Sequence, residues 1–291
     1  MKGLEPYNNG GFLDAQSGYK EAKAVILPFG FSASPAGKRG PEEIIEASKS
    51  LETFDDELFD DIPSRIPVWT AGQPELSAAS ENAVSALGSF CDGLAKDKKL
   101  PLVIGGDHTI TSGAISGLVQ RFRDVSLVIF DSHLDFIDPK EQKLNRNNWL
   151  GRALPYAQNA VVLGARSYNK AEWDFWKSNM SRLIVYEAGT EGAWNLRSAM
   201  DFLADYVYVS FDLDVLDPSI MPATENPEPE GLDFRQALNA LRTILSFRNV
   251  IGIDVCNYVP IPGFRTPALV AAMLIKKMIL YAFKGKELAG K

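Results

Sequence analysis

Acidic and imidazole side chains alternate directly after an apolar run in the middle of the chain. The stretch VSLVIFDSHLDF, residues 125–136, places Asp131, His133 and Asp135 at every second position. Alternate side chains point to the same side when the backbone is extended. Carboxylates and imidazoles that converge in this way are typical ligands of divalent metal ions. The stretch therefore predicts one wall of a metal site.

Two further apolar runs end in matching chemistry. LPLVIGGDHT, residues 100–109, places His108 behind a glycine pair, and YVYVSFDLDVLDP, residues 206–218, places Asp212 and Asp214 at alternate positions. A single histidine after such a turn is more often structural, and an aspartate near a strand end often only caps a turn or helix. Because both histidines of the chain lie in such settings, beside a second acidic pair, the combination favours a metal site over these simpler roles.

Electrostatics restricts what this cluster can be. Four carboxylates in one cleft repel each other and would be forced to hold protons unless cations share the space. Two divalent ions balance a formal charge of four. Oxygen ligands with one imidazole for each ion suit Mn²⁺ best, and Fe²⁺, Co²⁺, Ni²⁺ and Zn²⁺ are compatible with the same ligand types. Shared carboxylates would hold the two ions about 3.5–4 Å apart, as in two-metal hydrolytic sites.

The elements that must position these residues alternate along the chain. The runs are too continuously apolar for one-sided antiparallel strands, which favours a parallel sheet covered by helices on both faces. The carboxyl ends of parallel strands meet at one edge, where such sheets hold their ligands. Strands are predicted at residues 24–29, 100–105, 125–130, 160–165, 182–187, 206–211 and 249–255. Helices are predicted at residues 40–51, 80–95, 111–122, 169–180, 194–204 and 233–247.

Composition limits the class of protein. The 291 residues are 46% hydrophobic and 23% charged, without a linker, repeat or compositional break, which predicts a single domain over residues 1–291. A net charge of -7 without a basic cluster argues against nucleic-acid binding and favours a small-molecule substrate. The two cysteines, Cys91 and Cys256, lie far apart in the sequence, so a disulfide is not expected.

Neither end of the chain predicts a membrane segment. The start, MKGLEPYNNGGFLDAQ, has no basic and apolar signal-peptide pattern, so a cytoplasmic location is expected. The apolar stretch TPALVAAMLIKKMILYAF, residues 266–283, nears the length of a membrane span. Two lysines interrupt its middle and its apolar residues recur at helical spacing, so it predicts a packed helix.

These motifs together resemble the ureohydrolase superfamily of arginases, agmatinases and formimidoylglutamases. GGDHT resembles the family's GGDHS, DSHLD its DAHxD, and SFDLDVLDPSIMPATENPEPEGL its SFDxDxxDPxxxPxTGTPxxGGL. The resemblance extends to LPFGFSASPAGKRGPEEIIEAS near the start and to GIDVCNYVP and TPALVAAMLI near the end. It implies the three-layer αβα sandwich of this family, in agreement with the α/β fold class predicted from the strand and helix pattern.

The resemblance also implies roles for the acidic and imidazole residues. One ion would be held by His108, Asp131, Asp135 and Asp212, and the other by His133, Asp131, Asp212 and Asp214. A hydroxide between the ions would be the nucleophile that cleaves a linear, non-peptide C–N bond. Asp135 would orient it and pass a proton to the departing amine. Family members are commonly trimers or hexamers, so a homo-oligomer is implied.

The sequence departs from the family on the substrate side. Arginases and agmatinases carry a histidine in an HG dipeptide after DAHxD. Here that position falls on Arg146, Asn147 or Asn148, and no third histidine exists. Asn257 stands where the pattern DVVEVSP has the glutamate that holds a guanidinium, and Glu225 and Asn226 replace the GT of TGTP. An amide lacks the charge of a carboxylate partner for a planar cation. These six positions are the candidate substrate-binding residues.

Three functional interpretations remain open at this point. In the first interpretation, the chain is a working dinuclear hydrolase whose substrate is another amidine, guanidine or amide, different from arginine and agmatine. Alternatively, it is an ordinary agmatinase-type hydrolase in which Glu225 supplies the missing carboxylate, or a regulatory homologue that binds metal without turnover. Retention of all six ligands favours the first. Arg146 suits an acidic substrate if its guanidinium binds a carboxylate, although a surface arginine is the simpler reading.

Overall fold

The central element of the structure, a computed structural model, is an eight-stranded sheet. The structure describes residues 3–8, 10–57, 59–136, 143–190, 192 and 194–289. The strand order is β4-β1-β5-β10-β9-β6-β7-β8, and all neighbours pair in parallel. The strands are β1 (Ala24–Phe29), β4 (Val68–Thr70), β5 (Leu100–Gly105), β6 (Val125–Phe130), β7 (Asn159–Ala165), β8 (Leu183–Glu187), β9 (Tyr206–Asp212) and β10 (Asn249–Cys256). The predicted parallel sheet is confirmed.

Apolar side chains on both faces of the sheet form two separate cores. Every residue of β1, β5, β6 and β7 is buried, as expected for strands covered on both sides. Successive residues alternate between the cores, so that Ile26 packs on one face and Leu27 on the other. The continuous apolar runs in the sequence arise from this two-sided burial.

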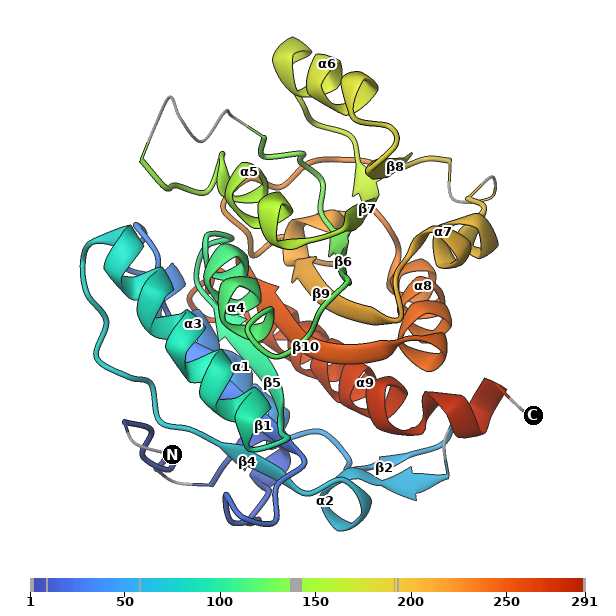
Figure 1. Cartoon of the computed structure of the whole chain (residues 1–291). Helices are drawn as coiled ribbons and strands as arrows, with labels where there is room; N and C mark the ends of the chain where they lie inside the picture. Colours follow the sequence, from blue (N-terminus) through green and yellow to red (C-terminus); the bar gives the residue numbers. More distant parts are fainter. Residues whose placement is uncertain are drawn as a thin grey trace.

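Helices cover both faces of the sheet (Figure 1). The core of one face includes residues of α1 (Gly40–Ser48), α7 (Leu196–Phe202), α8 (Phe234–Phe247) and α9 (Thr266–Ala289). The core of the other includes residues of α3 (Ser80–Lys96), α4 (Ile110–Leu118), α5 (Trp149–Ala153) and α6 (Lys170–Ser178). The three-layer α/β sandwich predicted from the sequence is therefore confirmed.

Helix α9 is the predicted apolar C-terminal helix. Its segment Thr266–Gly285 is long and apolar enough to cross a membrane, with a mean hydropathy of 1.5, but 61% of that window is buried inside the protein. Its two central lysines bind a segment near the start of the chain. Lys276 Nζ donates to the carbonyl oxygens of Glu52 and Phe54, both at 2.7 Å, and Lys277 Nζ lies 2.7 Å from Asp55 Oδ2. The packed-helix prediction is confirmed.

Short elements and boundaries were the weak part of the sequence-based prediction. It missed β4, the antiparallel pair β2 (Phe54–Asp55) and β3 (Asp60–Asp61), α2 (Ile62–Arg65) and α5, because elements of two to five residues carry too little periodicity. The helix expected at residues 111–122 spans only Ile110–Leu118. The helices expected from residues 169 and 233 begin one residue later, since Asn169 and Asp233 are their N-caps, each in a capping box.

Candidate metal centre

Three strands bring the predicted ligands to one edge of the sheet, and a fourth strand lies among them. His108 follows β5, Asp131 directly follows β6, and Asp212 is the last residue of β9. Strand β10 lies between β5 and β9, so Asn257, the first residue after it, enters the same edge. The sequence predicted the three ligand-bearing strand ends. Their order in space, with Asn257 between them, comes from the strand crossovers.

The glycine pair before His108 permits a close backbone approach. A Cβ built on Gly106 would lie 2.2 Å from the carbonyl oxygen of Phe31, which no side chain tolerates. The backbone amide of Asn257 also donates to the Gly106 carbonyl at 2.7 Å. The turn that carries His108 is thereby held against both neighbouring strand ends, and the imidazole is only 2% exposed.

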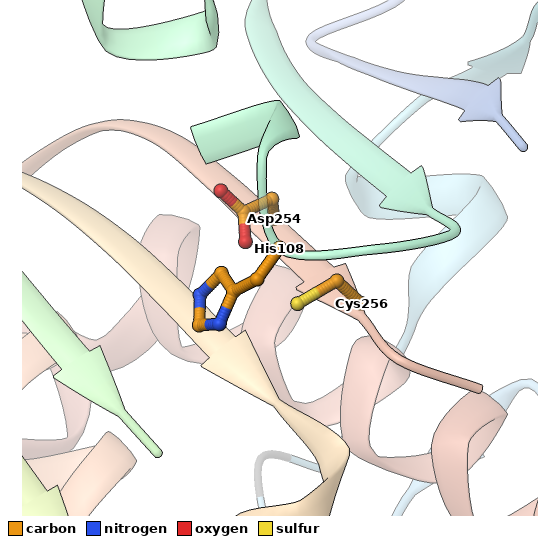
Figure 2. Close-up of side chains that lie close together, drawn as sticks. All are labelled: His108, Asp254 and Cys256. Carbon is orange, nitrogen blue, oxygen red and sulfur yellow. The ribbon is translucent and has the colours of Figure 1, made fainter. Parts of the chain in front are cut away.

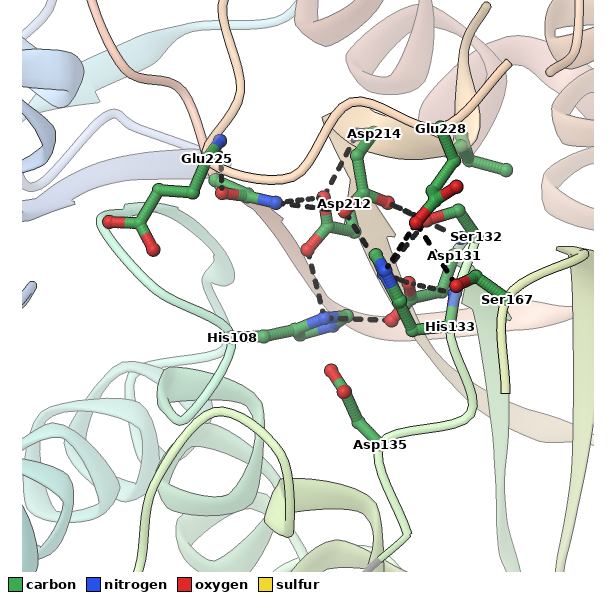
Figure 3. A network of polar contacts seen from close by, with 12 residues as sticks. His108, Asp131, Ser132, His133, Asp135, Ser167, Asp212, Asp214, Glu225 and Glu228 are labelled. Atoms are coloured by element: carbon green, nitrogen blue, oxygen red, sulfur yellow. Dashed lines mark hydrogen bonds and ion pairs between the residues drawn. The ribbon is translucent and has the colours of Figure 1, made fainter. Parts of the chain in front are cut away.

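His108, Asp131 and Asp212 form the first group of convergent ligand atoms (Figure 3). His108 Nδ1 lies 3.0 Å from Asp131 Oδ2 and 3.1 Å from Asp212 Oδ2. His108 Nδ1 and Asp131 Oδ2 are nevertheless buried without a hydrogen-bond partner. Buried polar atoms of this kind are rare unless a further group, such as an ion, satisfies them.

Asp131, His133 and Asp214 form the second group, which shares Asp131 with the first. His133 Nδ1 lies 3.2 Å from Asp214 Oδ2 and 3.6 Å from Asp131 Oδ1. The Ser132 hydroxyl donates to Asp214 Oδ1 at 2.8 Å, and the backbone amide of His133 donates to Asp131 Oδ1 at 2.8 Å. Both carboxylates are therefore oriented by the segment that carries His133.

Asp135 lies at the same cavity but outside these two groups. Its backbone has a positive φ of 47°, so the extended conformation assumed from the alternate spacing ends before it. The Trp149 indole donates from Nε1 to Asp135 Oδ2 at 3.2 Å, and the same ring stacks on His108 with centroids 4.0 Å apart. Figure 3 shows the Asp135 side chain pointing toward His108, and its bond to Trp149 ties it to α5, an element that the sequence did not predict.

The pKa shifts of the cluster agree with the predicted charge imbalance. Burial, and then the neighbouring carboxylate of Asp131, hold the pKa of Asp135 well above its ordinary value. Burial and Asp212 raise the pKa of Asp214 to about 7. Burial lowers the pKa of His133, but its contacts with Asp131 and Asp214 outweigh burial and raise it to about 12. Protons are thus held where divalent cations would balance the same negative charge.

A polar network behind His108 fixes its other ring nitrogen. His108 Nε2 lies 2.8 Å from Ser210 Oγ, which donates to Asp254 Oδ1 at 2.7 Å. Thr111 and Tyr208 donate to the other oxygen of Asp254 at 2.8 and 2.5 Å. The fully buried Asp254 carboxylate is thus satisfied by three hydroxyl groups, and it orients His108 through Ser210.

His108, Asp254 and Cys256 form a third cluster of potential ligands (Figure 2). Burial holds the pKa of the Cys256 thiol well above its ordinary value, whereas a metal ligand must be the thiolate. The thiol lies 3.6 Å from Asp212 Oδ2. Because three hydroxyl groups already occupy the Asp254 carboxylate, its role here is to orient His108 of the first group through Ser210.

Asn257 connects the two groups through hydrogen bonds to one carboxylate of each. Its side-chain Nδ2 donates to Asp212 Oδ1 at 2.9 Å and to Asp214 Oδ2 at 3.0 Å. Its Oδ1 accepts from the backbone amide of Glu225 at 3.3 Å. The backbone has a positive φ of 68°, a conformation that asparagine adopts more readily than most residues. Asn257 thus fills a donor position between two carboxylates.

Most of the candidate substrate residues line two spaces that share lining residues. An inner cavity of about 20 Å³ at the ligand cluster is bordered by Arg146, Asn147, Asn226 and Asn257. Arg146 and Asn147 also line an outer cavity of about 940 Å³, together with Glu225. Asn148 does not line either space: it is buried and bonded to Lys143 and Asn145 of its own loop. Five of the six candidates therefore line at least one of these two cavities.

An ion pair joins two of the residues that line the larger cavity. The Arg146 guanidinium binds the Glu225 carboxylate, and their side chains are 41% and 20% exposed. Each is the other's partner, so Glu225 is not a free carboxylate and Arg146 is not a free cation in this conformation. Residues 137–142, which precede Arg146 on the same loop, lie outside the described residues.

Several residues that contact the cluster are not among the site residues predicted from the sequence. Ser210 stands at an alternate position two residues before Asp212, so its orientation toward the cluster was available from strand periodicity. Trp149, Asp254 and Glu228 come from elements distant in sequence. Their contacts with the cluster depend on how α5, β10 and the loop after β9 pack.

Comparisons with known proteins agree with this geometry. A sequence model of the arginase family matches residues 22–281. The chain is 28% identical to an agmatinase of Halalkalibacterium halodurans, covering 96% of this chain and 99% of that one, and 26% identical to an N(1)-aminopropylagmatine ureohydrolase of Synechocystis, covering 93% of each. The structure of an agmatine ureohydrolase of Thermoplasma volcanium superimposes with a TM-score of 0.84 at 25% identity, covering 97% of both chains. A formiminoglutamase variant of Trypanosoma cruzi, solved with Mn²⁺, has a TM-score of 0.81 at 20% identity and covers 92% of this chain and 96% of that one.

Proposed function

Because this chain belongs to the arginase family and is therefore a metal-dependent hydrolase of C–N bonds other than peptide bonds, we propose that two Mn²⁺ ions serve its reaction. The observation that carries the proposal is the convergence of two ligand groups on Asp131, with His108 Nδ1 and Asp131 Oδ2 buried and without hydrogen-bond partners. The proposed ligands are His108, Asp131, His133, Asp135, Asp212 and Asp214.

The donor set favours Mn²⁺ over softer metals. Each of the two groups that share Asp131 offers carboxylate oxygens and one imidazole nitrogen, and neither includes a sulfur ligand among the described residues. Oxygen-rich sites with imidazole suit Mn²⁺, although Fe²⁺, Co²⁺, Ni²⁺ and Zn²⁺ bind similar ligands. The Trypanosoma cruzi relative solved with Mn²⁺ supports the same choice.

The protein's own residues supply positioning and proton transfer. When bound, the two ions would lower the pKa of a water molecule and polarise the substrate. Trp149 holds one oxygen of Asp135 and leaves the other for the cavity. In this proposal Asp135 orients the attacking water and carries a proton to the departing amine. Asp131, which both ligand groups share, and Asp212 would help to hold the two ions.

The substrate side favours a substrate other than arginine or agmatine. Asn257 is neutral and uses its amide hydrogens on Asp212 and Asp214, so it offers no charge to a guanidinium. The carboxylate of Glu225 is occupied by Arg146, which disfavours Glu225 as a ready substitute. We therefore assign the substrate to the amidine, guanidino or related amide compounds with a less basic reacting group.

Guanidino hydrolysis of the agmatinase type is the second candidate function. The relatives from Halalkalibacterium halodurans and Synechocystis, named agmatinase and N(1)-aminopropylagmatine ureohydrolase, match nearly the full chain. Under this alternative, binding of the substrate would separate Glu225 from Arg146.

For both candidate functions we propose that the protein acts as a single-domain, cytoplasmic homo-oligomer, a trimer or hexamer by analogy with the family.

A substrate screen of the Mn²⁺-loaded protein separates these candidates. Guanidino, formimino and amide compounds would be tested, with urea, formamide and ammonia detected separately. The matched control is Asp212→Asn, which keeps the shape of a central ligand but removes its charge. Hydrolysis of an amidine or amide with little urea from agmatine supports the first candidate, and rapid urea release from agmatine supports the second. Equal rates for the wild type and the control would contradict the proposed site.

A further inference from the structure

The second imidazole of the cluster has a carboxylate behind it that the proposed mechanism does not use. His133 presents Nδ1 to Asp131 and Asp214, and its other ring nitrogen, Nε2, lies 3.8 Å from Glu228 Oε1 (Figure 3). Glu228 comes from the loop after β9, 95 positions away in sequence from His133. The imidazole therefore lies between two acidic groups on one side and a third on the other.

The structure holds Glu228 in this position through its side chain. The Ser167 hydroxyl donates to Glu228 Oε1 at 3.0 Å. Ser167 is itself fixed beside His133, because the two residues form an isolated parallel bridge and the Ser167 backbone amide donates to the Ser132 carbonyl at 2.9 Å. The carboxylate that faces Nε2 is thus anchored to the backbone segment that carries the imidazole.

Arg166 fixes the backbone of the same loop. Its guanidinium donates to the carbonyl oxygens of Glu228 and Pro229, each at 2.8 Å, and to that of Asp214 at 2.8 Å. Gly231 leaves the space that this side chain needs, since a Cβ there would lie 2.7 Å from Arg166 Nη2. The guanidinium of Arg166 therefore binds both the loop of Glu228 and the backbone of the proposed ligand Asp214, which fixes the position of this loop relative to the cluster.

We infer that Glu228 is a positioning residue that sets the tautomer and orientation of His133 for metal binding. A neutral imidazole carries its proton on only one nitrogen, and a carboxylate behind the ring favours that proton on the nitrogen facing it. With the proton on Nε2, the lone pair of Nδ1 points to Asp131 and Asp214. A movement of about 1 Å closes the gap between Nε2 and Glu228 to hydrogen-bond length.

The two imidazoles of the cluster are thereby oriented by different means. Ser210 and the buried Asp254 lie behind Nε2 of His108, whereas a carboxylate that is 36% exposed faces Nε2 of His133 directly. Carboxylates behind metal-bound histidines raise the basicity of the ring, and their loss costs roughly 10- to 100-fold in metal affinity or activity. Among the described residues, His133 is the one proposed ligand that the Glu228 carboxylate contacts, so its loss should weaken one of the two metal sites and spare the other.

This inference rests on the proposed function, and its test is a Mn²⁺ titration of wild type, Glu228→Ala, Glu228→Gln and Ser167→Ala. Binding is followed by calorimetry and by the electron paramagnetic resonance signal, which distinguishes single ions from a coupled pair. We expect Glu228→Ala to weaken one of the two binding steps by roughly 10- to 100-fold. Glu228→Gln, which still accepts a hydrogen bond but lacks the charge, falls between Ala and wild type, and Ser167→Ala shows a smaller loss.

The matched control is Glu230→Gln, an exposed glutamate of the same loop, which should bind Mn²⁺ like the wild type. Unfolding temperatures of the metal-free proteins show whether any variant loses its fold. If Glu228→Ala is unfolded, Glu228→Gln replaces it as the test variant. Two tight sites in the wild type with unchanged binding in Glu228→Ala overturn this inference and leave the proposed function intact. A folded wild type that binds no ions overturns both.

Discussion

The two sides of the inner cavity are built in different ways. On the metal side, Asp131, Asp212 and Asp214 stand at strand ends, are 1% to 4% exposed, and each makes contacts that fix its orientation. On the substrate side, Arg146 and Glu225 stand on loops, are partly exposed, and are fixed mainly by each other. The rigid side retains the family's residues, and the loop side departs from them.

This difference indicates where the specificity of the enzyme resides. Side chains at the ends of buried strands cannot move without disturbing the two cores, so the reaction chemistry is fixed there. Loop residues change without such a cost, so the substrate can change while the reaction stays the same. Asn257 belongs to both sides, because it lines the cavity and also donates to two of the proposed ligands.

The largest expected effect comes from the centre of the metal side. Asp131→Asn removes the carboxylate that both groups share, and Asp212→Asn removes a carboxylate of the first group that is proposed to bridge the ions. For either variant we expect loss of at least one ion and a fall in kcat of about 10³-fold or more, equivalent to about 4 kcal/mol. Metal content by elemental analysis and kcat are the measurements. Asp124→Asn is the control, because Asp124 is exposed and asparagine tolerates its positive φ of 53°. Full activity in Asp131→Asn would contradict the view that the metal side of the cavity carries the reaction chemistry.

On the metal side, substitution of Asp135 should lower kcat much more than it lowers metal binding. Because it lies outside both convergent groups, Asp135→Asn should lower kcat by about 10²- to 10⁴-fold, the usual contribution of a positioned acid or base. At least one ion should remain bound, and KM should change far less than kcat. Steady-state kinetics combined with metal analysis test this. A variant that keeps its kcat would show that another group carries the proton.

Asn257→Glu tests the substrate side at its contact with the metal side. A carboxylate there would provide the charged partner that a guanidinium requires, so trace hydrolysis of agmatine by the Mn²⁺-loaded protein should rise by about 30-fold, equivalent to about 2 kcal/mol. Asn257→Asp is the matched variant: it adds the same charge, tolerates the positive φ, and is too short to reach as far. Urea release is the measurement. Fast agmatine hydrolysis by the unmodified protein would contradict the assigned specificity.

The smallest effect is expected at the ion pair of the outer loops. Arg146→Gln and Glu225→Gln should change the unfolding temperature little, because partly exposed pairs contribute about 0–1 kcal/mol. KM for the natural substrate should shift by up to about 5-fold, the equivalent of 1 kcal/mol. Thermal unfolding and steady-state kinetics on the compound found in the screen measure both. A hundredfold loss of kcat in Arg146→Gln would instead place Arg146 in the chemical step.

The sequence by itself determined the layers of the fold and the identity of the cluster. The strands at residues 100–105 and 125–130 match β5 and β6 in full, because burial on both faces makes such strands continuous apolar runs. The alternate spacing at Asp212 and Asp214 and the glycine pair before His108 indicated the ligand residues, since local geometry at a strand end suffices for that. Whether these residues bind metal stays a prediction.

Only the tertiary structure decided which residues surround the cluster and which hydrogen-bond and ion-pair partners they have. Asn257 enters between Asp212 and Asp214 because β10 lies between β5 and β9, an order that no local pattern encodes. Trp149 and Glu228 reach Asp135 and His133 from distant segments, and Arg146 meets Glu225 across 79 positions of sequence. Such contacts depend on how separate elements pack, whereas sequence periodicity reports only which face of its own element a residue occupies.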